Sequence, residues 1–268
     1  MLSYLDYPFF RYAMAASLLL SICAGLIGTY IVARRLTSIA GGVTHACFGG
    51  LGLGYFLGIN PIVTAALFAI GSSVGVQWMS GRFNLREDSA IAVVWALGMA
   101  VGTMFVFLTP GYVPELNAFL FGNIMTVSAA DLQAFAIFTV VLAAFFALLR
   151  RRIVAVAFDA DFASVIGLPV RFISYAMTVL VAVCIVLTIR LVGIMLLMSM
   201  LSLPVMTAEI FTHRFAPLAL WSALVAALCS LGGLALSTVI DVPCSALIVL
   251  LLAAVFIVAR LSAALVKR

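Results

Sequence analysis

Long apolar stretches recur along the chain, separated by charged residues, proline or glycine. A helix needs about 20 predominantly apolar residues to cross the hydrocarbon core of a bilayer, so each stretch predicts a membrane-spanning helix. Nine such helices are expected, at residues 12–33, 39–57, 62–79, 90–108, 132–149, 172–189, 191–206, 216–238 and 245–258. Because the seventh and ninth stretches are short, eight full spans plus one broken or tilted segment is the competing interpretation.

Composition places the chain among integral membrane proteins. Of its 268 residues, 66% are hydrophobic and only 9% are charged, whereas soluble domains carry roughly 25% charged residues. We therefore predict an all-α, polytopic helical bundle in which residues 1–268 form a single transmembrane domain. The five cysteines lie in apolar stretches without metal-finger spacing, which predicts packing roles rather than a structural zinc site.

Positive charges indicate the orientation of the chain. With the N-terminus outside, the predicted inner loops collect all but two, Arg11 and Arg190, of the 14 Lys and Arg residues. This bias follows the general excess of Lys and Arg in cytoplasmic loops. It supports an odd number of spans with an outer N-terminus and an inner C-terminus, and it explains the net charge of +5 without a nucleic-acid partner.

The connection at residues 109–130 is longer than a turn. It contains an apolar run that is interrupted by Asn117, Gly122 and Asn123 and is too short to cross a bilayer. Non-helical backbone at membrane depth is tolerated only where protein or a water-filled cavity covers it. We therefore expect a half-helix or re-entrant element here, with Asn117 and Asn123 at the transport pathway or in its packing.

The connection at residues 150–171 lies on the predicted inner side. Acidic residues come early in it and Gly167-Leu168-Pro169 come late, which is the order expected for the start and the end of a short helix. We predict a helix that lies at the membrane surface and serves as a docking element for a partner protein.

No recognisable set of catalytic residues is present in the sequence. The two histidines and nine acids lie mostly at predicted span ends or in loops, and no phosphate-binding loop or zinc-protease helix can be assembled from them. We therefore predict a protein that is not an enzyme. If it moves a substance uphill, the energy comes from a partner protein or from an ion gradient. Gradient-driven carriers usually hold several ionisable groups at mid-membrane, and this chain has almost none.

His45 is an ionisable side chain inside a predicted span. On a helix, Gly41 and Gly49 lie one turn to either side of it on the same face, so another backbone can approach closely. Cys47 points about 200° away from His45 and is a poor co-ligand. Two interpretations stay open: His45 binds a metal ion in a pathway with a ligand from another helix or subunit, or it is hydrogen-bonded across a helix interface.

Six sequence motifs occur in order along the chain. They are Arg35-Leu36 with Thr44-His45-Ala46, residues 49–55, Leu120-Phe121-Gly122-Asn123-Ile124 before Asp131, residues 158–163, Gly167-Leu168-Pro169, and Arg190-Leu191-Val192-Gly193-Ile194 followed by Pro204. Together they resemble the permease subunits of bacterial zinc and manganese ABC transporters over nearly the whole chain. Each motif is weak alone, whereas the ordered series is specific.

The resemblance implies partners and a location. Permeases of this kind are homodimers in the bacterial cytoplasmic (inner) membrane. They work with two cytoplasmic ATPase subunits and receive the ion from an extracytoplasmic metal-binding protein. ATP then binds the partner subunit, and the permease binds no cofactor permanently. The transported substrate implied by the resemblance is a divalent metal ion, zinc or manganese.

The resemblance also implies residue roles. His45 corresponds to the histidine of the family's Ser-His-Ala signature, with Thr44 in place of the serine. Many members carry an aspartate four residues before that histidine, where this chain has Gly41. The inner connection corresponds to the segment that couples to the ATPase, and its expected contact residues are Asp159, Asp161, Phe162, Gly167, Leu168 and Pro169.

Our hypothesis is therefore a non-catalytic permease that forms the pathway for zinc or manganese and is driven by a separate ATPase. His45 is expected as a transient metal ligand, with Gly41, Thr44 and Gly49 at the pathway or in its packing. Two alternatives stay open. One is an ABC permease for a metal chelate or siderophore, which is typically longer than this chain. The other is a stand-alone, gradient-driven carrier, which would transport without any ATPase.

Overall fold

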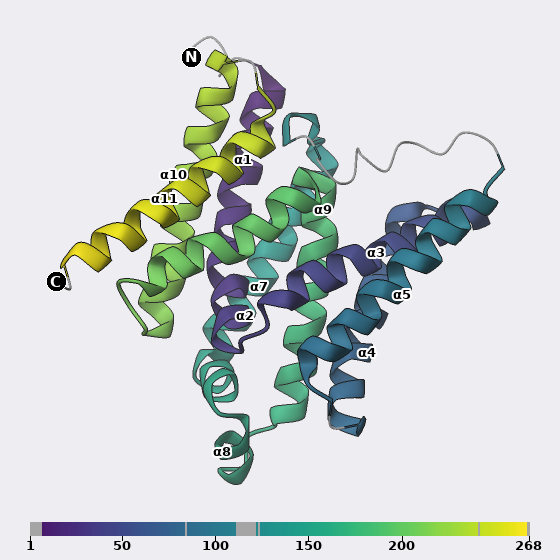
Figure 1. Ribbon diagram of the computed structural model, residues 1–268, viewed down its shortest axis with the longest axis horizontal. Coiled ribbons are helices and arrows are strands. Elements are labelled where there is room, and N and C mark those ends of the chain that lie inside the picture. The colour runs from purple at the N-terminus through teal and green to yellow at the C-terminus, as the bar shows by residue number, and fades with distance from the viewer. Residues whose placement is uncertain (1–6, 84, 111–121, 123, 241, 267–268) are drawn as a thin grey trace. The chain divides into compact units, whose positions relative to one another are not determined.

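The computed structural model describes residues 7–83, 85–110, 122, 124–240 and 242–266, and every regular element in these ranges is helical (Figure 1). The elements are α1 (Pro8–Cys23), the π-helical turn η2 (Ala24–Gly28), α2 (Thr29–Ala33), α3 (Thr37–Leu57), α4 (Pro61–Phe83), α5 (Glu87–Leu108), the 3-10 turn η3 (Ile124–Thr126), α7 (Ala129–Phe158), α8 (Ala160–Val165), α9 (Val170–Glu209), α10 (Phe215–Ile240) and α11 (Cys244–Val266). The predicted all-α fold is confirmed.

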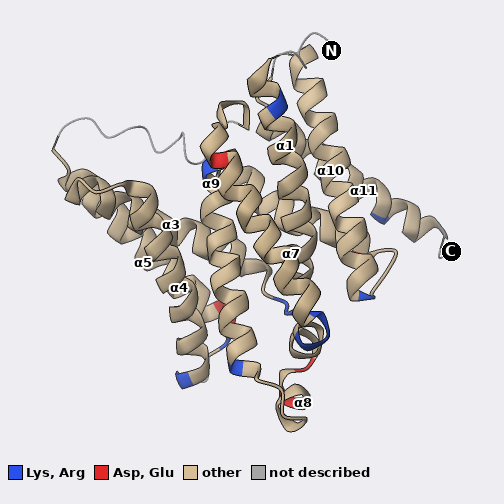
Figure 2. Cartoon of the chain, turned by 180° about the vertical axis from the view of Figure 1, so that it is seen from behind, with Lys and Arg blue, Asp and Glu red and all other residues tan. Residues whose placement is uncertain are grey.

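Within the described ranges, seven helical segments are long and apolar enough to cross a membrane. They are Pro8–Ala33, which joins α1, η2 and α2, and then α4, α5, α7, α9, α10 and most of α11. Figure 2 shows long stretches of helix without a charged residue. Helices of this length and hydrophobicity satisfy their backbone hydrogen bonds internally, as a lipid environment requires. The prediction of a polytopic membrane protein is confirmed at this level.

Three predicted spans differ from these seven segments. α3 covers the predicted span 39–57 but is not one of the seven segments, because six glycines and His45 lower its mean hydropathy. α9 holds the sixth and seventh predicted spans in one element of 40 residues. Inside it Gly193 has φ 80° and ψ 172°, a conformation that is essentially restricted to glycine, so the helix is broken there. The count of nine spans stays a prediction.

α7 ends later than the sequence pattern indicates. It continues past residue 149 to Phe158, through Arg150, Arg151 and Arg152, which were expected in a connection. Arginine is a good helix former, and its long side chain can reach water from a helix that has just left the bilayer. All three side chains are exposed. The charge therefore marks where α7 leaves the apolar region and not where the helix ends.

The contacts divide the chain into two compact units. Unit 1 comprises Met1–Ala33, Leu116–Arg150 and Leu187–Arg268, and unit 2 comprises Arg34–Glu115 and Arg151–Val186. α7 and α9 therefore each contribute one part to each unit. The prediction of one transmembrane domain over residues 1–268 stays a prediction.

Unit 2 is built on close contacts between the backbones of α3, α4 and α5. A Cβ placed on Gly98 of α5 would lie 2.5 Å from Ala46 Cα of α3, and one on Gly102 would lie 2.5 Å from the Phe48 carbonyl oxygen. On the other side of α3, a Cβ on Gly50 would lie 2.5 Å from the Thr64 carbonyl oxygen of α4. Small residues at such interfaces let membrane helices approach closely. The glycines of α3 thus serve helix packing on two faces.

In unit 1, glycines of the N-terminal helix also allow close backbone contacts with neighbouring helices. A Cβ on Gly25, in the π-helical turn, would lie 2.5 Å from the Ala219 carbonyl oxygen of α10, and one on Gly28 would lie 2.5 Å from that of Leu201 in α9. Val205, Ala208 and Leu218 form a buried apolar cluster at the α9–α10 contact. The N-terminal helix is therefore held on its partners by backbone contact as well as by apolar side chains.

Replacing Gly98 by alanine is predicted to destabilise the protein. The new Cβ meets the backbone of α3, which can yield only if the two helices separate, and overpacking of this kind costs about 1–3 kcal/mol. Gly71→Ala is the matched control, since a Cβ at Gly71 of α4 has nothing within 4 Å and alanine is the better helix former. Thermal unfolding in detergent should show a lower midpoint for Gly98→Ala and an unchanged or higher midpoint for Gly71→Ala. Equal midpoints would contradict the packing argument.

Candidate functional site

His45 lies in the middle of α3 and is half-buried. Its Nδ1 is 2.7 Å from the carbonyl oxygen of Gly41, one turn earlier on the same helix. A carbonyl oxygen only accepts, so Nδ1 carries the hydrogen and donates it. In the neutral imidazole this fixes the tautomer and leaves the lone pair on Nε2. His45 is therefore held by its own helix rather than by a hydrogen bond across a helix interface.

Trp95 of α5 covers one face of the His45 ring. The two rings are stacked with their centroids 4.5 Å apart and their planes inclined by 22°. This placement follows from the backbone contact of Ala46 with Gly98, because Ala46 is next to His45 and Trp95 lies one turn before Gly98. An aromatic pair at this separation lies in the range of favourable offset stacking. Sequence reasoning missed Trp95, and its only signal was the pair Gly98 and Gly102 at small-xxx-small spacing.

The residues near His45 on α3 form hydrogen bonds within their own helix or pack against α5. The Thr44 hydroxyl donates to the Ala40 carbonyl, and the Cys47 thiol donates to the Val43 carbonyl at 3.0 Å, so both buried side chains turn back onto their own helix. A Cβ on Gly49 would lie 2.9 Å from the Gly98 carbonyl oxygen, which makes Gly49 a packing residue. Gly41 supplies its carbonyl to His45. Asn117 and Asn123 lie outside the described residues.

A preformed metal site is not found in the part of the chain that the structure describes. No group of three or more His, Cys, Asp and Glu side chains there could hold an ion. Neither α3 nor α4 contains an acidic residue, and those of α5 stand in its first turn. Glu87 pairs with Arg34 at 3.5 Å, and Asp88 accepts a hydrogen bond of 2.7 Å from Ser38. Among the described residues of unit 2, His45 thus has no neighbouring carboxylate.

A short helix, α8, lies in the connection for which a surface helix was predicted. Asp159 is its N-cap, and the carboxylate accepts a hydrogen bond of 2.8 Å from the Phe162 amide. Gly167, with φ 78°, ends the turn after the helix, and the Leu168 amide donates to the Ala163 carbonyl at 3.0 Å. Asp159 and Gly167 are the residues that the sequence indicated for the start and the end of a short helix. What α8 contacts in an assembly stays a prediction.

Polar contacts attach both flanks of α8 to the helices of unit 2. The Arg34 guanidinium, which pairs with Glu87 of α5, also donates to the Val156 carbonyl in the last turn of α7 at 3.4 Å. On the other flank, the Thr178 hydroxyl of α9 donates to the Gln77 side chain of α4 at 2.8 Å. The segment that carries α8 and the helix that carries His45 therefore belong to one connected unit.

Two of the six motifs, the one around Gly122 and the one that begins at Arg190, contact each other in unit 1. Asp131 and Arg190 form an ion pair with 2.5 Å between Oδ1 and Nε, and the Ser128 hydroxyl donates to the other Asp131 oxygen at 2.6 Å. Gly122 lies against the backbone of Val192 and Gly193, so closely that a Cβ would not fit. The break in α9 thus lies directly beside Gly122. Most of the predicted re-entrant run around Gly122 lies outside the described residues.

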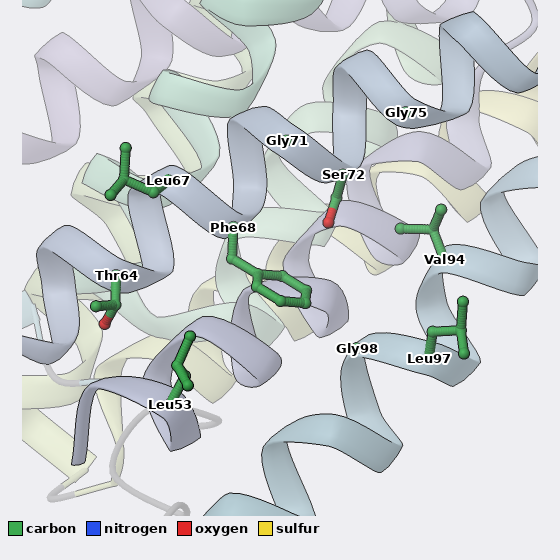
Figure 3. A pocket seen from close by; sticks show the side chains of 10 residues that line it. All are labelled: Leu53, Thr64, Leu67, Phe68, Gly71, Ser72, Gly75, Val94, Leu97 and Gly98. Carbon is green, nitrogen blue, oxygen red and sulfur yellow. The ribbon is translucent and has the colours of Figure 1, made fainter. Parts of the chain in front are cut away.

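A cavity of about 450 Å³ lies between α3, α4 and α5 (Figure 3). Its lining includes Leu53, Phe68, Leu97 and the glycines of α4 and α5, and Ser72 and Thr64 add two hydroxyl groups. Neither His45 nor Trp95 lines it. An apolar cavity without a charged or imidazole ligand is unsuited to a bare divalent ion. The candidate ion site therefore lies at the His45–Trp95 pair and not in this cavity.

Comparison with protein families identifies the family of this chain. The model of the ABC 3 transport family matches residues 6–263. The chain belongs to the ABC 3 transport family. This membership confirms the resemblance noted from the motifs and the prediction of a non-catalytic membrane subunit of an ABC transporter. It argues against the stand-alone carrier.

Relatives and solved structures agree with this assignment. The chain is 34% identical over 251 residues to a probable metal transport system membrane protein of Chlamydia pneumoniae, covering 91% of this chain and 84% of the relative. It is 26% identical over 259 residues to the manganese transport system membrane protein MntC of Listeria monocytogenes, covering 97% and 92%. Its fold is similar to that of PsaBC from Streptococcus pneumoniae, solved in complex with Fab, with a TM-score of 0.83 at 23% identity over 96% of this chain and 92% of that one.

Proposed function

We propose that the chain is the permease of an ATP-driven importer for a divalent transition metal ion, zinc or manganese, and that the ion passes His45. Relatives of matching length are named as metal and manganese transport membrane proteins. The observation that carries the proposal is the imidazole of His45, which keeps the lone pair of Nε2 for a ligand in the middle of a membrane helix. Imidazole nitrogen is a suitable ligand for borderline divalent metals.

One imidazole holds an ion only weakly, so the proposal includes a second subunit. In a two-fold homodimer identical elements can meet at the axis, and two imidazoles then share the ion. Few neutral ligands suit a pathway, because a tightly bound ion leaves slowly. A metal chelate or siderophore brings its own ligands and has no need of an imidazole, so His45 favours the free ion over the chelate.

Replacing His45 by alanine is predicted to reduce metal uptake by at least about tenfold, because the imidazole ligand is lost. His213→Ala is the matched control, since His213 is exposed in the α9–α10 connection. Uptake of radioactive zinc and manganese by cells that produce the complete transporter measures the effect. Normal uptake by a stably inserted His45→Ala protein would overturn the role of His45.

The proposed ATPase contact is α8 and its flanks. Phe162 and Val165 are 60% and 84% exposed, and Phe158 and Ile166 are exposed beside them. This apolar patch follows the arginines that end the apolar part of α7, so it lies where a soluble partner can reach it. Exposed apolar patches of this kind mark interaction sites. The two cytoplasmic ATPase subunits are the proposed partners, and ATP binds there rather than on the permease.

Replacing Phe162 by serine is predicted to weaken ATPase binding by at least about tenfold, because burying a phenylalanine contributes about 1.5–3 kcal/mol. Phe211→Ser is the matched control, since Phe211 is equally exposed in another connection predicted on the inner side. Co-purification of the ATPase with the permease measures the effect. The same loss in both variants, or in neither, would count against α8 as the contact.

The proposed orientation has the N-terminus outside and the C-terminus in the cytoplasm of a bacterium, with the protein in the inner membrane. The charge distribution of the sequence supports it. In this orientation the connection at residues 109–130 faces outward, where an extracytoplasmic metal-binding protein delivers the ion. α8 faces the cytoplasm, where the ATPase is found.

Cysteine labelling with a membrane-impermeant reagent tests this orientation. Ser3→Cys and Val113→Cys should react in intact cells, whereas Asn84→Cys and Leu265→Cys should react only after the membrane is opened. The five native cysteines are buried, so their background reaction should be low. The reverse labelling pattern would invert the topology, and a mixed pattern would change the number of spans.

A further inference from the structure

We infer that Trp95 is a positioning residue of the ion pathway: it holds the His45 imidazole so that Nε2 faces the passing ion. This inference rests on the proposed role of His45. Trp95 supplies no ligand atom itself. It acts through the stacked contact of 4.5 Å between the two rings.

Two contacts together determine the orientation of the His45 ring. The hydrogen bond from Nδ1 to the Gly41 carbonyl directs one edge of the ring toward its own helix. The stack on Trp95 fixes the plane of the ring. The lone pair of Nε2 lies in the ring plane and therefore points along the indole surface rather than into it. An ion that approaches Nε2 passes along the face of Trp95.

The depth of Trp95 argues against an ordinary interfacial role. Trp95 and His45 are each the ninth residue of their helix, about 12 Å from its start at 1.5 Å per residue. α3 and α5 are joined through α4 and so run in the same direction. Tryptophans that anchor a protein in the headgroup region lie near helix ends. Trp95 is 40% exposed in the middle of α5, and its indole stacks on the His45 ring.

Apart from Trp95, the His45 ring is restrained by one hydrogen bond to its own helix. Ligating histidines usually donate their second N–H to a carboxylate or a carbonyl that orients the ring. Here that acceptor is the neutral Gly41 carbonyl, and the acidic residues of α5 are engaged with Arg34 and Ser38. A carbonyl on the same helix restrains one edge of the ring only. The indole provides the second restraint.

Uptake kinetics of the complete transporter, with its ATPase and binding protein, test the inference. Trp95→Ala should raise the KM for zinc uptake by about tenfold to a hundredfold, the usual effect of losing a residue that orients a metal ligand. The maximal rate should change far less. Trp95→Phe, which keeps a ring that can stack, should restore most of the affinity. Trp78→Ala is the matched control, because Trp78 of α4 contacts Phe83 and not His45.

A fluorescence experiment tests whether the metal ion binds at His45 beside the indole, as the inference requires. The chain has three tryptophans, so Trp78→Phe with Trp221→Phe leaves Trp95 as the only indole. Co²⁺ that binds at Nε2 should quench the emission of Trp95, and His45→Ala should abolish the quenching. Since this readout needs neither turnover nor a Trp95 substitution, it stands even if Trp95→Ala fails to fold.

The outcomes distinguish the inference from the proposed function. If His45→Ala abolishes uptake while Trp95→Ala keeps the wild-type KM, the inference is wrong and the pathway role of His45 stands. Emission of Trp95 that Co²⁺ leaves unchanged counts against metal binding at His45, and so against the proposed function on which the inference rests. If His45→Ala transports normally, the proposed role of His45 is wrong, and the inference about Trp95 is wrong with it.

Discussion

The contact between the backbones of α3 and α5 is the constraint on which the candidate site depends. Gly98 and Gly102 face Ala46 and Phe48 with no room for a side chain between the helices. Membrane helices gain their association energy from such close packing, because lipid tails are as apolar as the side chains they replace. A wider separation would carry Trp95 away from the His45 ring. The geometry of the site is therefore set by residues that touch no ion.

The candidate site also has no carboxylate beside it among the described residues of unit 2. α3 and α4 contain none, and Glu87 and Asp88 of α5 pair with Arg34 and Ser38. The groups at the His45–Trp95 pair are therefore an imidazole, an aromatic ring and backbone carbonyls. Hard ions such as Mn²⁺ bind best to carboxylates, and borderline ions such as Zn²⁺ bind well to imidazole. Gly41 contributes a hydrogen-bond acceptor, its carbonyl oxygen, and no charge. Surroundings without a carboxylate suit an ion that is bound briefly and then released.

The sequence predicts those features that depend on neighbouring residues. Apolar length indicates the spanning helices, and Asp159 and Gly167 indicate both ends of α8, because caps are local structures. Contacts between distant segments are not readable in this way. The stack of Trp95 on His45 depends on which face of α5 meets α3. The end of α7 was misplaced because a charged residue marks the edge of the bilayer and does not itself end a helix.

The glycines of α3 have a consequence for how this helix is stabilised in the membrane. Glycine is a poor helix former, and α3, with six glycines and His45, is not among the seven segments that are long and apolar enough to cross alone. Packing against neighbouring helices therefore supplies part of its stability in the bilayer. α4 and α5 follow directly in the chain and supply the backbone surfaces that its glycines fit. The helix that carries His45 is therefore stabilised in the bilayer as one member of a three-helix unit, through its contacts with α4 and α5.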